Sequence, residues 1–155
     1  MNELATNYWR EFWGKEDLPQ SVDAGQFGDD PDYLAELVLN GTKTATCYGA
    51  IFYELEKKRI PQPGDYSIIL DSTDCPLAII QLTRVDVVPM NEVTEAFAIA
   101  EGDGSYKNWY DIHKRYFYEK SHEVGIEFQE TMNLVCQTFE LIDVKAQSKR
   151  RGEKE

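Results

Sequence analysis

The 155-residue sequence contains only three cysteines, Cys47, Cys75 and Cys136, and no Cys-x-x-Cys pair. An odd number of widely spaced cysteines argues against a disulfide framework and is typical of reduced thiols in a cytoplasmic protein. Histidine is equally scarce, since only His113 and His122 occur. No His/Cys/Asp spacing suggests a metal site, so we expect neither a metal nor a cofactor.

Long hydrophobic segments are also missing. The apolar runs are far too short to span a membrane, and residues 1–14 are polar and aromatic without the apolar centre of a signal peptide. Neither a phosphate-binding Gly-rich Lys-Ser/Thr loop nor a Gly-x-Gly-x-x-Gly motif occurs. We therefore expect a cytoplasmic protein without membrane contact, and not one of the common nucleotide-binding folds.

Basic residues are few, with 16 Lys and Arg against 28 Asp and Glu, which gives a net charge of −12. Residues 145–155 carry +3 and are predicted to form a basic, flexible tail, whereas residues 1–144 have 11 basic and 26 acidic residues and carry −15. A body of this charge repels a long polyphosphate on average. The partner expected is a small nucleoside-like ligand, or a short RNA held in a local basic cleft.

Apolar residues make up 42% of the chain and aromatic residues 12%, which is typical of a globular protein. The length fits one domain over residues 1–144. Residues 2–14 predict an amphipathic helix whose large aromatic side chains either pack on the body or cover a homodimer contact. Residues 15–30 are predicted to be a loop. The aromatic residues of the predicted helix are Tyr8, Trp9, Phe12 and Trp13.

A second helix is predicted from Asp30 to Asn40, because Asp30 can cap it and Pro31 suits its first position. Gly41 stands where helices commonly end in a left-handed turn. The Thr-rich segment that follows prefers extended backbone. Lys43 and Thr46 should therefore lie at a helix-to-strand junction, which is either an ordinary strand start or a place where one cation and several hydroxyls gather.

Downstream, residues 66–70 and 77–88 predict two adjacent antiparallel strands, because a short turn joins them. A short helix over 51–58, helices over 92–100 and 106–121, and a final strand over 134–144 complete the pattern. Ser105 is a suitable cap for the helix at 106. The fold class predicted from this order is α+β.

These segments also resemble a known family. Gly41 to Thr46 reads Gly-Thr-Lys-Thr-Ala-Thr and resembles the Gly-x-Lys-Thr-x-Thr signature of the ASCH family. Residues 100–105, followed by Trp109, His113, Tyr116 and Phe117, are similar to a pattern of one bacterial branch, the acetylcytidine amidohydrolases. The resemblance covers about residues 30–144. It implies a small PUA-like β-barrel of five or six strands with surrounding helices, to which the helix at 2–14 is an addition.

The chemistry of the junction can be considered from the residues alone. A threonine hydroxyl is too weak a nucleophile near neutral pH without a base or an electropositive neighbour. Lys43, partly removed from water, could accept the Thr46 proton, and a carboxylate from Glu101 or Asp103 could orient the lysine. Taken one at a time, each side chain also has an ordinary explanation as an exposed strand residue, a strand hydroxyl or a helix-end carboxylate.

The resemblance assigns roles to the same residues. Some ASCH proteins hydrolyse acetylated cytidine with a Thr, a Lys and a carboxylate. Lys43 and Thr46 match directly, while the carboxylate stays open between Glu101 and Asp103. Three functions are therefore considered: an amidohydrolase acting on an N-acylated nucleoside, a noncatalytic module for RNA or a modified base, and a ribonuclease. Residues expected to contact the substrate are Thr44, Tyr48, Trp109, His113 and Tyr116.

Overall fold

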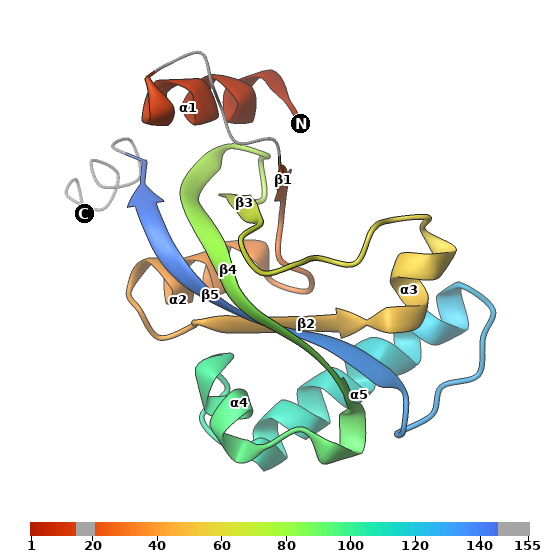
Figure 1. The fold of residues 1–155 in the computed structure, drawn as a ribbon. Coiled ribbons are helices and arrows are strands. Elements are labelled where there is room, and N and C mark those ends of the chain that lie inside the picture. The colour runs from red at the N-terminus through yellow and green to blue at the C-terminus, as the bar shows by residue number, and fades with distance from the viewer. Residues whose placement is uncertain (15–20, 146–155) are drawn as a thin grey trace. The chain divides into compact units, whose positions relative to one another are not determined.

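The computed structural model describes residues 1–14 and 21–145, which fall into two compact units. The first unit comprises Met1–Gly41, Pro63–Thr83 and the residues from Phe139 onward, and the second comprises Thr42–Gln62 and Arg84–Thr138. The strands form a five-stranded sheet in the order β1-β3-β4-β5-β2 (Figure 1). Its two longest strands, β4 (Pro76–Pro89) and β5 (Asn133–Val144), supply residues to both units. The basic tail expected from residue 145 lies, apart from Lys145, outside the described residues.

In the first unit, β3 (Tyr66–Leu70) pairs antiparallel with β4, with Tyr66 opposite Gln81. This pairing confirms the hairpin predicted from the sequence. Beside β3 runs β1 (Val22–Gly25), a parallel edge strand. The prediction of a loop over residues 15–30 is wrong at β1. The Asp and Gly of β1 are poor strand formers, so its sequence does not indicate a strand, and β1 forms because it pairs with β3.

Helix α1 (Glu3–Trp13) belongs to the first unit and begins where the Asn2 side chain accepts a bond from the Ala5 amide. Trp9 is only 3% exposed and packs in a cluster with Ile68 and Ile79 of the sheet. The expected burial of the aromatic face is confirmed for Trp9, while Phe12 and Trp13 are half-buried against the same cluster. Edge-to-face contacts connect Trp9 to Trp13 and to Tyr66.

Helix α2 (Pro31–Leu39) has the predicted start and stop. The Asp30 side chain accepts a bond from the Tyr33 amide, and Pro31 occupies the first turn. Gly41 follows with φ of 84°, a left-handed conformation that glycine adopts without a Cβ penalty. Asp30 and Pro31 therefore set the start of α2, and Gly41 sets the turn by which the chain leaves it, as the sequence predicted.

The second unit is built on β2 (Ala45–Gly49), which pairs antiparallel with β5 so that Cys47 lies opposite Cys136. Helix α3 (Ala50–Leu55) follows directly. The helix predicted over 92–100 is divided into a 3-10 turn, η1 (Met90–Glu92), and α4 (Glu95–Ala100), because Thr94 caps α4. The predicted long helix is α5 (Tyr106–Glu123), capped by Ser105 as expected.

The core of this unit is aromatic, with Phe52, Trp109 and Phe117 essentially inaccessible to solvent and packed with Leu134 of β5.

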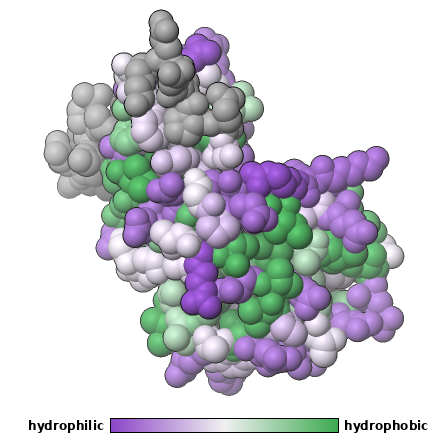
Figure 2. Space-filling view, viewed as in Figure 1, coloured by the Kyte–Doolittle hydropathy of each residue, from purple (hydrophilic) through white to green (hydrophobic). Residues whose placement is uncertain are grey.

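Figure 2 shows hydrophobic areas at the surface that are bordered by hydrophilic side chains. Among the described residues, no helix combines the length and the apolar character that crossing a membrane requires.

A buried ion-pair cluster as the candidate functional site

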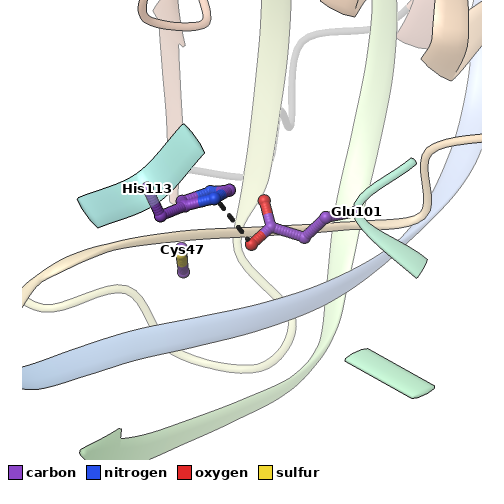
Figure 3. A group of neighbouring side chains, drawn as sticks. All are labelled: Cys47, Glu101 and His113. Atoms are coloured by element: carbon purple, nitrogen blue, oxygen red, sulfur yellow. Dashed lines mark ion pairs between the residues drawn. The ribbon is translucent and has the colours of Figure 1, made fainter. Parts of the chain in front are cut away.

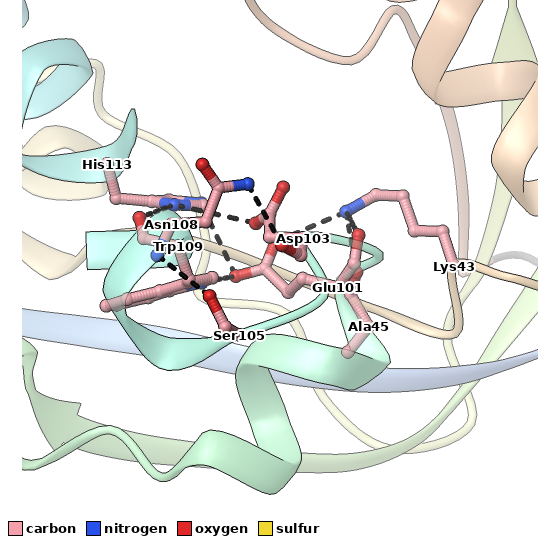
Figure 4. Close-up of polar contacts among 8 residues, drawn as sticks. All are labelled: Lys43, Ala45, Glu101, Asp103, Ser105, Asn108, Trp109 and His113. Atoms are coloured by element: carbon pink, nitrogen blue, oxygen red, sulfur yellow. Dashed lines mark hydrogen bonds and ion pairs between the residues drawn. The ribbon is translucent and has the colours of Figure 1, made fainter. Parts of the chain in front are cut away.

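The site begins where the chain leaves Gly41 and enters β2. The Thr44 amide donates to the carbonyl of Ala100 at 2.7 Å, which holds this extended segment against the end of α4. Glu101 is the next residue after that carbonyl. The two stretches that sequence reasoning connected only by resemblance, 41–46 and 100–105, are therefore adjacent here, and Lys43 lies beside Glu101 (Figure 4).

Lys43 is 3% exposed, and its ammonium group is held by three acceptors. Nζ donates to the Ala45 carbonyl at 2.8 Å, to the Glu101 carbonyl at 3.2 Å and to Glu101 Oε1 at 3.2 Å. An ammonium has three protons and no acceptor, so three acceptors match its capacity. The carboxylate supplies the opposite charge that a buried cation needs.

Glu101, also 3% exposed, is the centre of the cluster. Its Oε2 accepts a 2.6 Å bond from the Trp109 indole N–H and lies 3.4 Å from His113 Nε2. Burial by itself raises the pKa of a carboxyl group. Here that effect is outweighed by the hydrogen bond from His113, by the positive charges of Lys43 and His113, and by the hydrogen bond from Trp109. Together they hold the pKa of Glu101 at about 2. Glu101 is therefore ionised throughout the neutral range.

His113 lies flat on Trp109, with ring centroids 4.4 Å apart, and both of its ring nitrogens face acceptors. Nδ1 donates to the Trp109 carbonyl at 2.8 Å, because a carbonyl oxygen can only accept, and Nε2 faces Glu101. Burial lowers the pKa of His113, yet the bond and charge of Glu101, the Trp109 carbonyl and Asp103 raise it above its usual value. The geometry thus favours the imidazolium form.

Asp103 and His113 form the part of the cluster that reaches solvent, with side chains 16% and 15% exposed. Asp103 Oδ2 lies 3.9 Å from His113 Nδ1. Burial and the charge of Glu101 raise the pKa of Asp103 above its usual value, against the lowering effect of His113 and Lys43. The loop that carries Asp103 turns through Gly102 and Gly104, whose positive φ angles of 98° and 78° are accessible to glycine.

Cys47 reaches the same cluster from β2. Its sulfur, a Glu101 oxygen and a His113 ring nitrogen all lie within 4.8 Å of one another, the spacing of a three-ligand metal site (Figure 3). Two observations disfavour that use. Glu101 already accepts bonds from Lys43 and Trp109, and the Lys43 ammonium, 3.2 Å from Glu101, would repel a metal cation. Burial together with the Glu101 charge raises the pKa of Cys47 well above its ordinary value. The same high pKa makes Cys47 a poor nucleophile.

The structure brings together five of the residues expected at the site: Lys43, Glu101, Asp103, Trp109 and His113. Both candidate carboxylates are present, with Glu101 on the lysine and Asp103 at the surface. Cys47 is an additional member that sequence reasoning treated only as a reduced thiol. Its register opposite Cys136 in an antiparallel pair could not be read from spacing.

The other expected residues lie elsewhere in this unit. Thr46 pairs with Gln137 in β2, and strand alternation sends its side chain to the side of β2 opposite Cys47. Tyr48 donates its hydroxyl to Glu56 at 2.5 Å. Tyr116 packs edge-to-face on Phe117, and Thr44 is exposed.

The ionisation of the cluster predicts how stability depends on pH. A His113 pKa that is higher in the folded state than the usual 6.5 stabilises the fold fully below pH 6.5, and this contribution is lost as the pH rises through the raised value. We therefore expect the stability difference between the parent and His113→Gln, measured by urea unfolding, to be largest near pH 6 and to shrink by pH 9. His122→Gln, at the exposed end of α5, is the matched control. A difference that stays constant with pH would contradict a charged His113.

Comparison with known proteins adds a family and two close structural relatives. A family model described as the ASCH domain matches residues 23–143. The protein EF3133 from Enterococcus faecalis V583 is 38% identical, with 94% of this chain and 97% of that chain covered and a TM-score of 0.81. An ASCH domain from Lactobacillus crispatus JV V101 is 30% identical, with 91% and 95% covered and a TM-score of 0.83. The hypothetical protein PH0355, at 19% identity and a TM-score of 0.50 over 78% of this chain and 98% of its own, shares the fold alone. No curated protein matches the chain.

Proposed function

We propose that this chain, which belongs to the ASCH domain family and has the α+β, PUA-like fold that its motifs predicted, binds a modified nucleoside at the buried cluster. In this proposal it hydrolyses an N-acyl amide on the base, such as that of acetylated cytidine. The observation that carries this proposal is the Lys43–Glu101 ion pair, which is buried and continues through His113 to solvent. A buried cation beside a partly exposed carboxylate and a charged histidine is an arrangement suited to amide hydrolysis.

Amide hydrolysis adds an oxygen nucleophile to the carbonyl carbon, places negative charge on the carbonyl oxygen, and then breaks the C–N bond as the nitrogen takes a proton. Positioned cations stabilise that developing charge, and they do so more strongly away from water. The Lys43 ammonium and the His113 imidazolium can supply this stabilisation. Glu101 holds both of them in place, so its role is positioning and not proton transfer.

Proton transfer falls to the groups that reach the surface. The raised pKa of His113 favours its charged form, but its two N–H groups already face Glu101 and the Trp109 carbonyl, so His113 acts as a second fixed cation. The leaving nitrogen then takes its proton from Asp103, after Asp103 has accepted the proton of the nucleophile. Asp103 also has a raised pKa, which makes it a stronger base than an ordinary carboxylate. The Lys43 protons have three acceptors, so we assign Lys43 the role of a cation, and Asp103 that of the base which activates the nucleophile.

The nucleophile is Thr46 or a water molecule. Thr46 is one residue from Ala45, whose carbonyl accepts a bond from Lys43, but its side chain lies on the side of β2 opposite Cys47 and so away from Glu101 and His113, which disfavours it. A water molecule held between Asp103 and His113 is the alternative, since both side chains are partly exposed. The two candidates differ in what a Thr46 substitution does.

The test is deacylation of N-acylated nucleosides by the pure protein, followed by chromatography of the product. We expect Asp103→Asn to lower kcat/KM on the order of 100-fold, the usual effect of losing a general base. Thr46→Val should have a similar effect if Thr46 is the nucleophile and little effect if water is. Lys107→Ala, an exposed position of α5, is the control.

A noncatalytic module for RNA or a modified base is the second candidate, because the family is associated with RNA or nucleoside binding and because Lys43 and Glu101 are nearly inaccessible. Absence of turnover on every acylated nucleoside, with binding that survives Asp103→Asn, would replace the hydrolase by this module. Binding that weakens steeply with salt would then indicate phosphate contacts, and hence RNA. The net charge of −15 on residues 1–144 disfavours the third candidate, a ribonuclease acting on long RNA.

A further inference from the structure

A separate hollow in the second unit is lined by residues of α3, of the end of α5 and of the segment that leads into β5. Figure 1 shows where these elements lie in the chain. Its volume is about 820 Å³, within the range of small-molecule sites. None of its lining residues belongs to the Lys43–Glu101 cluster. The hollow is therefore distinct from the cluster and is formed by different segments of the chain.

Ser121 is the feature of the hollow that needs an explanation. It lines the hollow but is only 1% exposed, and its hydroxyl has no hydrogen-bond partner among the described residues. A buried hydroxyl without a partner loses its bonds to water and gains nothing in exchange, which is unfavourable. The hydroxyl oxygen is itself closed to solvent, so a ligand in the hollow supplies the missing partner when a small movement of the lining opens a path to it.

The remaining lining defines what that ligand is. Ile51, Ile126 and Met132 provide apolar surface, and Gln129 and Asn133 provide amide donors and acceptors. This combination suits a flat ring system with polar edges, since the faces of such a ring are apolar and its edges carry donors and acceptors.

The charges in the hollow exclude most phosphorylated ligands. Glu54 and Glu127 carry two negative charges against the single positive charge of Lys58. A phosphate group would meet net repulsion there, in a body that is itself strongly acidic. We infer that the hollow between α3 and the end of α5 is a second binding site, and that it takes an uncharged heterocycle of about nucleoside size.

Methyl groups in the hollow give a direct readout. In a protein with 13C-labelled isoleucine and methionine methyls, unphosphorylated adenosine and cytidine should shift the signals of Ile51, Ile60, Ile126 and Met132. Isoleucines outside the hollow, such as Ile68 and Ile99, serve as internal references. The corresponding 5′-monophosphates should bind at least several-fold more weakly. No shift at millimolar nucleoside would overturn the site, and equal binding of the monophosphates would overturn the ligand class.

Two substitutions locate the contact. Ser121→Ala should weaken nucleoside binding about threefold to tenfold, the effect of one hydrogen bond, without lowering the melting temperature, because the hydroxyl has no partner to lose. Ile60→Ala, at an exposed position in the lining, should weaken binding through lost apolar contact, whereas Ile99→Ala, which is exposed outside the hollow, should not. Unchanged affinity in both Ser121→Ala and Ile60→Ala would overturn the assignment. Deacylation at the Lys43–Glu101 cluster should be unaffected by these variants, so the two proposals fail independently.

Discussion

Glu101→Gln is expected to lower the free energy of unfolding by about 3 to 5 kcal/mol, because it leaves the Lys43 ammonium and the His113 imidazolium buried without their counter-ion. The amide keeps nearly the shape of the carboxylate, so packing around Trp109 is preserved, and the loss reports the missing charge together with the amide NH2 that now faces a donor of Lys43 or Trp109. The lowered pKa of Glu101 agrees in direction, since a carboxyl group whose pKa falls on folding stabilises the folded state at neutral pH. Urea unfolding at pH 7 measures this loss.

Two comparisons make the Glu101 result interpretable. The double variant Lys43→Met/Glu101→Gln should recover part of the loss, because it removes the uncompensated ammonium. Lys107→Met/Asp111→Asn removes an exposed ion pair of α5 and should change stability by no more than about 0.5 kcal/mol. A loss below about 1 kcal/mol for Glu101→Gln would mean that the cluster is not held by charge.

Trp9→Ala is the second large effect, with an expected loss of about 3 to 5 kcal/mol. Trp9 is buried against Ile68 and Ile79, and its ring also makes edge-to-face contacts with Trp13 and Tyr66. Truncation therefore removes transfer free energy and leaves a cavity beneath α1. Thermal or urea unfolding followed by circular dichroism gives the loss.

Leu4→Ala is the control on the same helix, because Leu4 is 55% exposed and alanine is at least as good a helix former. Its stability should stay within about 0.5 kcal/mol of the parent. Equal small effects at Leu4 and Trp9 would show that α1 is an accessory to the first unit. A deletion of residues 1–14 would then also leave the melting temperature unchanged.

Local signals predicted the elements whose determinants are local. Asp30, Pro31 and Gly41 bound α2 as their capping preferences require, and Ser105 caps α5. The short turn between β3 and β4 predicted their antiparallel pairing. By contrast, β1 depends on a parallel partner more than 40 residues away, so no pattern within Val22–Gly25 could indicate it.

The site was predictable only as far as motif resemblance reached. Composition and spacing could not decide between Glu101 and Asp103, because the choice depends on which carboxylate the α4–α5 loop turns inward. In the structure Glu101 is the carboxylate that turns inward, where it pairs with Lys43, and Asp103 lies beside His113 and is partly exposed. Cys47 and Ser121 carried no sequence signal, since their surroundings are created by strand register and by the packing of α3 near α5.

Two of the three acceptors around the Lys43 ammonium are main-chain carbonyls, those of Ala45 and Glu101. Side-chain substitution cannot delete a carbonyl, and these two are held where the Thr44 amide fixes the chain to Ala100. The acceptors around position 43 are therefore selective for the shape of the cationic group that they hold. A compact ammonium directs three protons to three oxygens, whereas the flat guanidinium of arginine carries five N–H donors in one plane and would leave some of them buried without acceptors. Exchange of lysine for arginine at position 43 would therefore keep the charge and lose the fit.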